Sequence, residues 1–325
     1  MPFAPSGPPS DPDDSSAFEA GERRGGQIPG AGRTAAWRLA AIEPSPLPIL
    51  IAVPHAGRTY PSALVERMRN PQFAAARLED RHVDRLGEAV ARATGAWLLV
   101  ADAPRAMIDL NRAPDDVDWD MFGREAQGGS FSPGRRARTG LGLIPRRLPG
   151  LGELWKRRHD EGELDARIAG VHDPYHAALA DALAALRERW GAALLIDLHS
   201  MPPLPVRGGH PPVQVVLGDR FGSSSHGRLV AAAFAHLAQQ RIIAAHNRPY
   251  AGGYVLERHA APAAGLHALQ IEIDRTCYLD SRMDQPGEGL DAMAAVLTGL
   301  VRRLATEVVA LGAAEPPPEW AEAAE

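Results

Sequence analysis

The stretch LLIDLHSMPP, from Leu194 to Pro203, carries the pattern that decides the fold. Its apolar residues stand at consecutive positions, which is typical of a strand covered on both faces in a parallel or mixed sheet. The stretch also contains Asp197, His199 and Ser200, polar groups that are costly to bury unless they are paired. We therefore expect the end of this strand to belong to a chemical site or to be held by hydrogen bonds.

Strand-like and helical patterns alternate along the rest of the chain. The apolar runs lie at residues 48–55, 96–102, 193–199, 213–219 and 267–273, and the helical patterns at residues 80–94, 173–190 and 290–304. This alternation predicts one α/β domain with a mostly parallel or mixed central sheet flanked by helices.

The two ends of the chain differ from this pattern. Gly, Pro and Ser make up sixteen of the first 33 residues, which leaves few apolar anchors. We expect a disordered tail over 1–33, the domain over 34–313 and a loose tail over 314–325. Segment 115–160, rich in Gly, Arg and Pro, is expected to be a long excursion over one end of the sheet.

Composition excludes several classes of protein. The 325 residues carry a net charge of −5, so no basic surplus indicates nucleic acid as a partner. No apolar run reaches the roughly 18 residues of a membrane span, and the N-terminus lacks the pattern of a secretory signal. Cys277 is the single cysteine, which excludes an intrachain disulfide and a cysteine-rich zinc site. We expect a cytoplasmic protein whose metal ligands, if any, are His and carboxylate side chains.

Two histidines stand at equivalent places in the predicted sheet. His55 follows one apolar strand and His199 ends another. Ligands of open α/β sheets bind beyond the carboxyl ends of the strands, where these two residues would meet. Two imidazoles, one carboxylate and an open position for water form a common catalytic zinc site. The alternative is that each histidine only makes structural hydrogen bonds.

The third metal ligand must be a carboxylate near these histidines. Arg58 occupies the position at which an H-x-x-E motif starting at His55 would have its glutamate, so the candidates are Glu79, Asp80 and Asp84. We favour Asp80 because it stands at the predicted helix start, which would hold a short carboxylate rigidly. Its alternative role is an N-cap. Similarly, Asp197 either orients an imidazole ligand from behind or caps a loop.

Glu272 is a carboxylate inside the apolar run LQIEI. It is a candidate general base, because burial raises a carboxyl pKa towards neutrality, where proton transfer at pH 7 is efficient. The alternative is a structural salt bridge.

An anion pocket is the next prediction. Arg105, Asn111 and Arg112 follow the strand at residues 96–102 and could hold a substrate carboxylate by a guanidinium fork and an amide. Surface ion pairs are the alternative. Gly252 and Gly253 lie in a glycine-rich segment that would let backbone approach a substrate, or would form a plain turn.

Several of these motifs, in this order, resemble the N-formylglutamate amidohydrolase family. They include VPHAGRTYP (53–61), RAMIDLNRAPDD (105–116), LLIDLHSMP (194–202) and YAGGYVLERHAAPAAGLHALQIEIDRTCYLD (250–280). The resemblance implies a zinc-dependent hydrolase that converts N-formyl-L-glutamate to formate and L-glutamate, late in histidine breakdown. It also implies a fold like that of zinc-dependent exopeptidases.

The resemblance further implies roles for individual residues. His55 and His199 would be metal ligands, Glu272 the base, and Arg105 with Asn111 and Arg112 the carboxylate grip. The resemblance does not identify the third ligand, so Asp80 stays the candidate on the argument given above. The alternative functions are hydrolysis of another N-acyl amino acid by a deacylase or carboxypeptidase-like enzyme, and metal-free binding of a dicarboxylate without catalysis.

Overall fold

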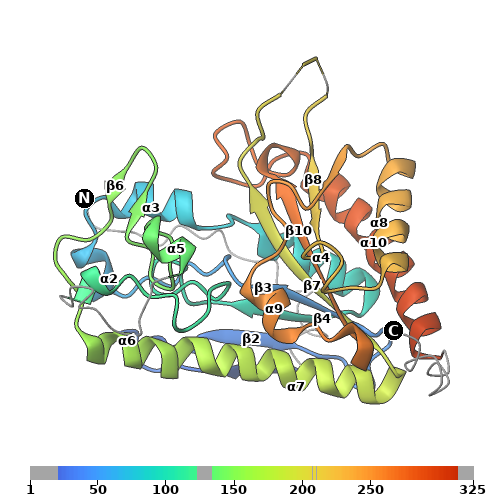
Figure 1. The fold of residues 1–325 in the computed structure, drawn as a ribbon, viewed down its shortest axis with the longest axis horizontal. Helices are drawn as coiled ribbons and strands as arrows, with labels where there is room; N and C mark the ends of the chain where they lie inside the picture. Colours follow the sequence, from blue (N-terminus) through green and yellow to red (C-terminus); the bar gives the residue numbers. More distant parts are fainter. Residues whose placement is uncertain (1–20, 123–133, 207, 210, 314–325) are drawn as a thin grey trace, which may run out of the picture.

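A mixed sheet of eight strands forms the centre of the computed structural model, which describes residues 21–122, 134–206, 208–209 and 211–313 (Figure 1). The strand order is β1-β2-β4-β3-β7-β10-β8-β9. The four central strands β4, β3, β7 and β10 run parallel to one another, whereas β2 and β8 are antiparallel to their central neighbours. The strands are β1 (Glu22–Gly25), β2 (Trp37–Ala40), β3 (Ile49–Val53), β4 (Trp97–Ala101), β7 (Ala193–Met201), β8 (Val215–Gly218), β9 (Ala244–His246) and β10 (Leu266–Asp274).

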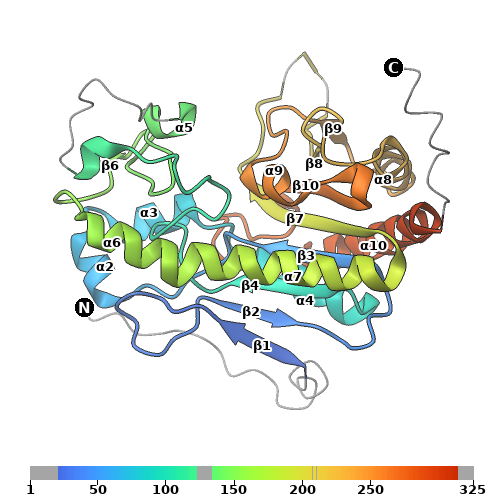
Figure 2. The same cartoon turned by 60° about the horizontal axis from the view of Figure 1, so that its bottom comes forward.

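Helices cover both faces of this sheet (Figures 1 and 2). Helix α7 (Asp173–Trp190) lies on one face, and α4 (Val83–Thr94), α8 (Gly227–Gln239) and α10 (Leu290–Gly312) lie on the other. The remaining helices are α2 (Ser62–Arg67), α3 (Pro71–Leu78), α5 (Arg135–Arg138), α6 (Glu161–Arg167) and α9 (Tyr254–His259). A two-stranded hairpin, β5 (Arg147–Leu148) with β6 (Gly152–Glu153), lies apart from the main sheet.

Alternation along β7 shows how one strand serves two cores. Leu195 packs in the core that α7 covers, whereas Ile196 packs in the core formed with α4, α8 and α10. Successive side chains of a strand point to opposite faces, so a strand between two helical layers must be apolar almost throughout. The predicted α/β domain with a mixed central sheet is confirmed.

The expected N-terminal tail is wrong over residues 21–33. Strand β1 pairs with β2 as an antiparallel edge, and Ile28 is fully buried. This edge is held by backbone hydrogen bonds and one apolar anchor, so its sequence ERRG carries no hydrophobic pattern. Residues 1–20 and 314–325 of the two expected tails, and residues 123–133 of the expected excursion, lie outside the described residues.

The predicted start of the helix at residue 80 is also wrong. Helix α4 begins at Val83, and His82 before it has a left-handed backbone with φ of 57°. Asp80 therefore lies in the turn that precedes the helix, and no side chain caps α4. Among the described helices, none is both long and apolar enough to cross a membrane.

Candidate active site

The parallel strands bring three of the predicted site residues to one edge of the sheet. His55 stands two residues after β3, and His199 lies in β7, which pairs with β3. Glu272 of β10 is the register partner of His199. Asp80 reaches the same edge from the turn between α3 and α4, where its backbone N–H donates to the carbonyl of His55 at 2.9 Å.

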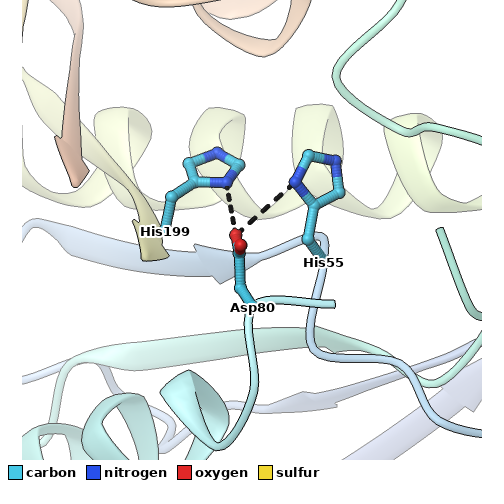
Figure 3. A group of neighbouring side chains, drawn as sticks. All are labelled: His55, Asp80 and His199. Atoms are coloured by element: carbon cyan, nitrogen blue, oxygen red, sulfur yellow. Dashed lines mark hydrogen bonds and ion pairs between the residues drawn. The ribbon is translucent and has the colours of Figure 1, made fainter. Parts of the chain in front are cut away.

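Asp80 stands between the two imidazoles (Figure 3). Its Oδ2 lies 3.0 Å from His199 Nδ1 and 3.6 Å from His55 Nδ1. All three side chains are buried, and one possible ligand atom from each lies within 4.8 Å of the other two. Glu79 and Asp84 point elsewhere: Glu79 faces Arg81, and Asp84 forms an ion pair with Arg58.

A carboxylate also supports each imidazole from behind. His55 Nε2 lies 2.8 Å from Asp109 Oδ1, and His199 Nε2 lies 2.9 Å from Asp197 Oδ2. Such contacts fix the orientation of a histidine and increase the basicity of the nitrogen that faces the metal. Asp197 thus lies where the sequence suggested that an orienting partner could stand.

The charges of this group favour a cation. Burial would lower the pKa of His199, but Asp197 and Asp80 outweigh burial and raise it well above its usual value. Burial would likewise raise the pKa of Asp80, but its hydrogen bond with His199 and its close contact with His55 hold it below the usual range. The carboxylates therefore stabilise positive charge at this point, whether it is a proton or a metal ion.

These residues fit a divalent metal. His55 Nδ1 is buried and has no hydrogen-bond partner among the described residues, so its lone pair is left to bind a metal ion. Two imidazole nitrogens and one carboxylate oxygen are a known donor set of catalytic zinc sites, which keep a further position open. His55, Asp80 and His199 could therefore hold one such ion.

Glu272 lies in the cavity beside this group. It is buried, and Gln270 Nε2 donates a hydrogen bond to its Oε1 at 2.9 Å. Burial raises the pKa of Glu272 to about 7, although His199 opposes the shift. No cation among the described residues forms an ion pair with Glu272, so the salt-bridge alternative is not realised there.

The predicted anion-binding residues line the same cavity, but the protein already uses several of their donors. Arg105 Nε and NH2 bind Asp109 Oδ2 at 2.9 and 2.8 Å. Arg112 donates from Nε to the carbonyl of Leu141 and from NH1 to the carbonyl of Asn111. Each guanidinium thus keeps one terminal nitrogen that has no hydrogen-bond partner among the described residues.

Asn111 is held by the glycine-rich segment opposite. Its Oδ1 accepts from the backbone N–H of Val255, near the start of α9, at 2.9 Å. A Cβ on Gly253 would lie 2.4 Å from Asn111 Oδ1, so only glycine permits this approach. Gly252 has φ of +108°, a backbone region that favours glycine. Both glycines line the cavity.

The cavity has a volume of about 320 Å³ and contains residues that the sequence analysis did not single out. Arg275 holds the turn that carries Asp80, because it donates to the carbonyls of Ala76 and Glu79 and to Ser200 Oγ. Its position directly after β10, in EIDRTC, is the sequence signal that could have found it. Other polar lining residues that were missed are Arg77, Arg136, Tyr250 and Gln270.

Comparisons with known proteins agree on one family. The family model for N-formylglutamate amidohydrolase matches residues 47–279. A curated N-formylglutamate deformylase of Pseudomonas putida is 30% identical over 243 residues, covering 72% of this chain and 82% of that protein. Another, of Pseudomonas aeruginosa, is 29% identical over 279 residues, covering 82% and 94%.

Solved structures give the same answer. The crystal structure of an N-formylglutamate amidohydrolase from Ralstonia eutropha is 33% identical with a TM-score of 0.76, covering 85% of this chain and 99% of that one. The structure of gene product Atu2144 from Agrobacterium tumefaciens, 19% identical with a TM-score of 0.59, shares the fold over 84% of this chain and 96% of its own. This chain belongs to the N-formylglutamate amidohydrolase family of amide-bond hydrolases.

Proposed function

We propose that this chain hydrolyses N-formyl-L-glutamate to formate and L-glutamate, with one zinc ion held by His55, Asp80 and His199. The observation that carries the proposal is the meeting of this ligand group with Glu272 in one cavity, in a member of a family named for that reaction. Cytoplasmic location and a late place in histidine breakdown are part of the proposal and depend on the family resemblance alone.

The metal and Glu272 divide the chemistry between them. A zinc ion at this place supplies a Lewis acid, which lowers the pKa of water and polarises an acyl oxygen. Glu272 takes a proton from the attacking water while the water oxygen bonds to the formyl carbon. As the C–N bond breaks, Glu272 returns the proton to the leaving nitrogen, which becomes the amine of glutamate. A pKa of Glu272 raised by burial suits both transfers.

The arginines and Asn111 orient the substrate. Arg105 and Arg112 each have one terminal nitrogen without a partner among the described residues. That of Arg112 binds a substrate carboxylate together with the amide of Asn111, and that of Arg105 stabilises the developing oxyanion. Holding the reacting groups in place lowers the barrier by removing the entropy cost of their meeting. Gly252 and Gly253 let the backbone approach the substrate at the wall opposite.

Glu272→Gln is the central test. We expect kcat for formate release to fall by about 10²- to 10⁴-fold, the usual contribution of a general base, while the zinc content stays unchanged. Glu307→Gln is a matched control, because Glu307 on α10 is as buried as Glu272 but pairs with Arg228 on α8, outside the site. Normal turnover by Glu272→Gln would refute the assignment of the base.

Three substrates separate the alternatives. Formate release from N-formyl-L-glutamate, abolished by a chelator and restored by zinc, supports the proposal. Faster hydrolysis of N-acetyl-L-glutamate or N-formyl-L-alanine would assign the chain to another N-acyl amino acid. Tight binding of N-formyl-L-glutamate by the zinc-loaded protein without any formate would identify a binding protein.

A further inference from the structure

Three buried histidines lie behind the segment that carries Asn111 and Arg112, and the reaction above does not use them. His172 ends a π-turn (Ile168–His172) that leads into α7, His176 lies in the first turns of α7, and His259 ends α9. We call these three residues the histidine cluster. His172 and His176 are four positions apart in the sequence, and the centroids of their rings lie 4.4 Å from each other.

The cluster binds two backbone carbonyls of residues 110–112, which we call the substrate segment. His176 Nε2 lies 3.0 Å from the carbonyl oxygen of Leu110, and His172 Nε2 lies 3.0 Å from that of Arg112. A carbonyl oxygen only accepts hydrogen bonds, so both Nε2 atoms must carry the proton. Among the described residues, no backbone N–H donates to either carbonyl, which makes the histidines their partners.

His259 sets the tautomer of His176. Its Nε2 lies 2.9 Å from His176 Nδ1, and the two rings are stacked with an angle of 12° between their planes. Burial lowers the pKa of His176 to about 2 and that of His259 to about 4, so both rings are neutral at pH 7. Because neutral His176 carries its proton on Nε2, its Nδ1 accepts from His259. The hydrogen bonds thus run in one direction, from His259 through His176 to Leu110.

The segment is fixed from two sides by this arrangement. The carbonyls of Leu110 and Arg112 bind the histidines, while the side chain of Asn111 between them binds the N–H of Val255 on α9. His259 lies at the other end of the same helix. A shift of α9 or of the histidines would therefore move Asn111 and Arg112 together.

A second metal site does not explain the cluster. His55, Asp80 and His199 are the group of possible metal ligands that the described residues contain. Among the described residues, the carboxylate that contacts the cluster is that of Asp173, whose Oδ1 lies 3.4 Å from His172 Nδ1. The side chain of Asp173 is 60% exposed. His172 Nε2 and His176 Nε2 are already bound to carbonyls, and His176 Nδ1 is bound to the imidazole of His259.

We propose that the histidine cluster positions Asn111 and Arg112 for the substrate carboxylate, with His176 as the residue through which the alignment is set. Its members are positioning residues, since His172 and His176 contact the substrate segment from behind and His259 acts through His176. The identity of the carboxylate substrate rests on the proposed function, whereas the positioning of the segment does not.

Two substitutions of His176 separate positioning from stability. In His176→Gln the amide nitrogen takes the place of Nε2, so the bond to Leu110 is kept. In His176→Asn the amide takes the place of Nδ1, so the contact with His259 is kept and the bond to Leu110 is lost. Each variant keeps one hydrogen bond, so a purely structural role predicts similar kinetics for both.

We expect His176→Asn to raise KM for N-formyl-L-glutamate by about five- to tenfold, the effect of one hydrogen bond of about 1 kcal/mol, with kcat and zinc content near wild type. His176→Gln should keep KM within about twofold of wild type. His267→Asn is the matched control, because His267 is buried on β10 away from the substrate segment. It should leave KM unchanged.

Amide hydrogen exchange of residues 109–116 in the substrate-free protein gives an independent measurement. His176→Asn should accelerate this exchange, and His176→Gln should not. Equal KM and equal exchange in His176→Asn and wild type would overturn the proposal, as would equal increases in both variants. If wild type releases no formate, the proposed function fails, while the exchange still decides whether His176 positions the segment.

Discussion

Two groups of buried imidazoles, the candidate metal centre and the histidine cluster, differ in what their nitrogens face. In the candidate metal centre, His55 and His199 are surrounded by the carboxylates of Asp80, Asp109 and Asp197. In the histidine cluster, the inward nitrogens face backbone carbonyls and a second imidazole. The same side chain is therefore placed in a negative environment in one group and in a neutral environment in the other.

This difference decides which group can hold a cation. The pKa of His199 is raised because Asp197 and Asp80 outweigh burial, whereas that of His176 is lowered by burial and by the nearby His172, His259 and Arg258. A divalent ion in the first group compensates charges that are already buried. A charge on His176 would be buried without a carboxylate in contact among the described residues, which is costly. The two groups are thus suited to binding a metal and to fixing backbone, respectively.

The largest expected effect comes from removing the carboxylate that joins the two imidazoles. Asp80→Asn keeps the volume but loses the charged oxygen ligand, so zinc affinity should fall by more than the roughly 100-fold that a supporting carboxylate alone can contribute. Calorimetric titration with zinc measures the affinity, and formate release should fall to background. Asp84→Asn is the control, because Asp84 pairs with Arg58 instead. Zinc binding by Asp80→Asn with wild-type affinity would place the ion elsewhere.

A smaller effect is expected from the carboxylate behind His199. Asp197 is fully buried and contacts His199 Nε2, so Asp197→Asn should weaken zinc binding by about 10- to 100-fold while leaving the ligands in place. Asp219 offers a matched control, since it is buried and lies 3.1 Å from His246 Nε2 at a distant edge of the sheet. Asp219→Asn should leave zinc affinity unchanged. A loss below threefold in Asp197→Asn would contradict the supporting role.

The clustering of the candidate metal ligands could be predicted from sequence because topology supplies their long-range contacts. Parallel strands end at one edge, so polar residues at their ends must meet there, and this brought His55, His199 and Glu272 together. Asp80 was chosen for its expected place at a helix start, and the structure puts it in the turn before α4. The predicted geometry that selected Asp80 is therefore wrong, and the turn before α4, not a helix start, brings the carboxylate to the imidazoles.

The histidine cluster could not be predicted in the same way. His172 and His176 are visible as a pair in HDPYH, but His259 lies 83 positions beyond His176 and no periodic pattern joins them. The edge strand β1 was missed for a related reason, since backbone pairing at an edge needs no apolar run. Contacts made by backbone atoms leave little trace in the sequence.

The smallest effect is a dependence of stability on pH that the histidine cluster should produce. Burial lowers the pKa of His259 to about 4 and that of His176 to about 2, below the usual value of 6.5. Between these values the unfolded chain binds more protons than the folded one, so the stabilisation is complete above about pH 6.5 and is lost as the pH falls. Each histidine contributes at most about 1.4 kcal/mol per pH unit to this slope. The titratable or charged groups that face them are His172, Tyr175, Tyr254, Arg258 and Asp173.

Urea unfolding of the chelated protein between pH 7 and 4.5 measures this slope without interference from a bound metal. We expect His259→Asn to reduce the slope by about 1 kcal/mol per pH unit, because one neutral buried imidazole is removed. His226→Asn is the control, since His226 is exposed at the start of α8 and Asn is also a good N-cap there. If His259→Asn kept the wild-type slope, the cluster would carry protons in the folded protein. The contrast with the metal centre, where carboxylates hold positive charge, would then fail.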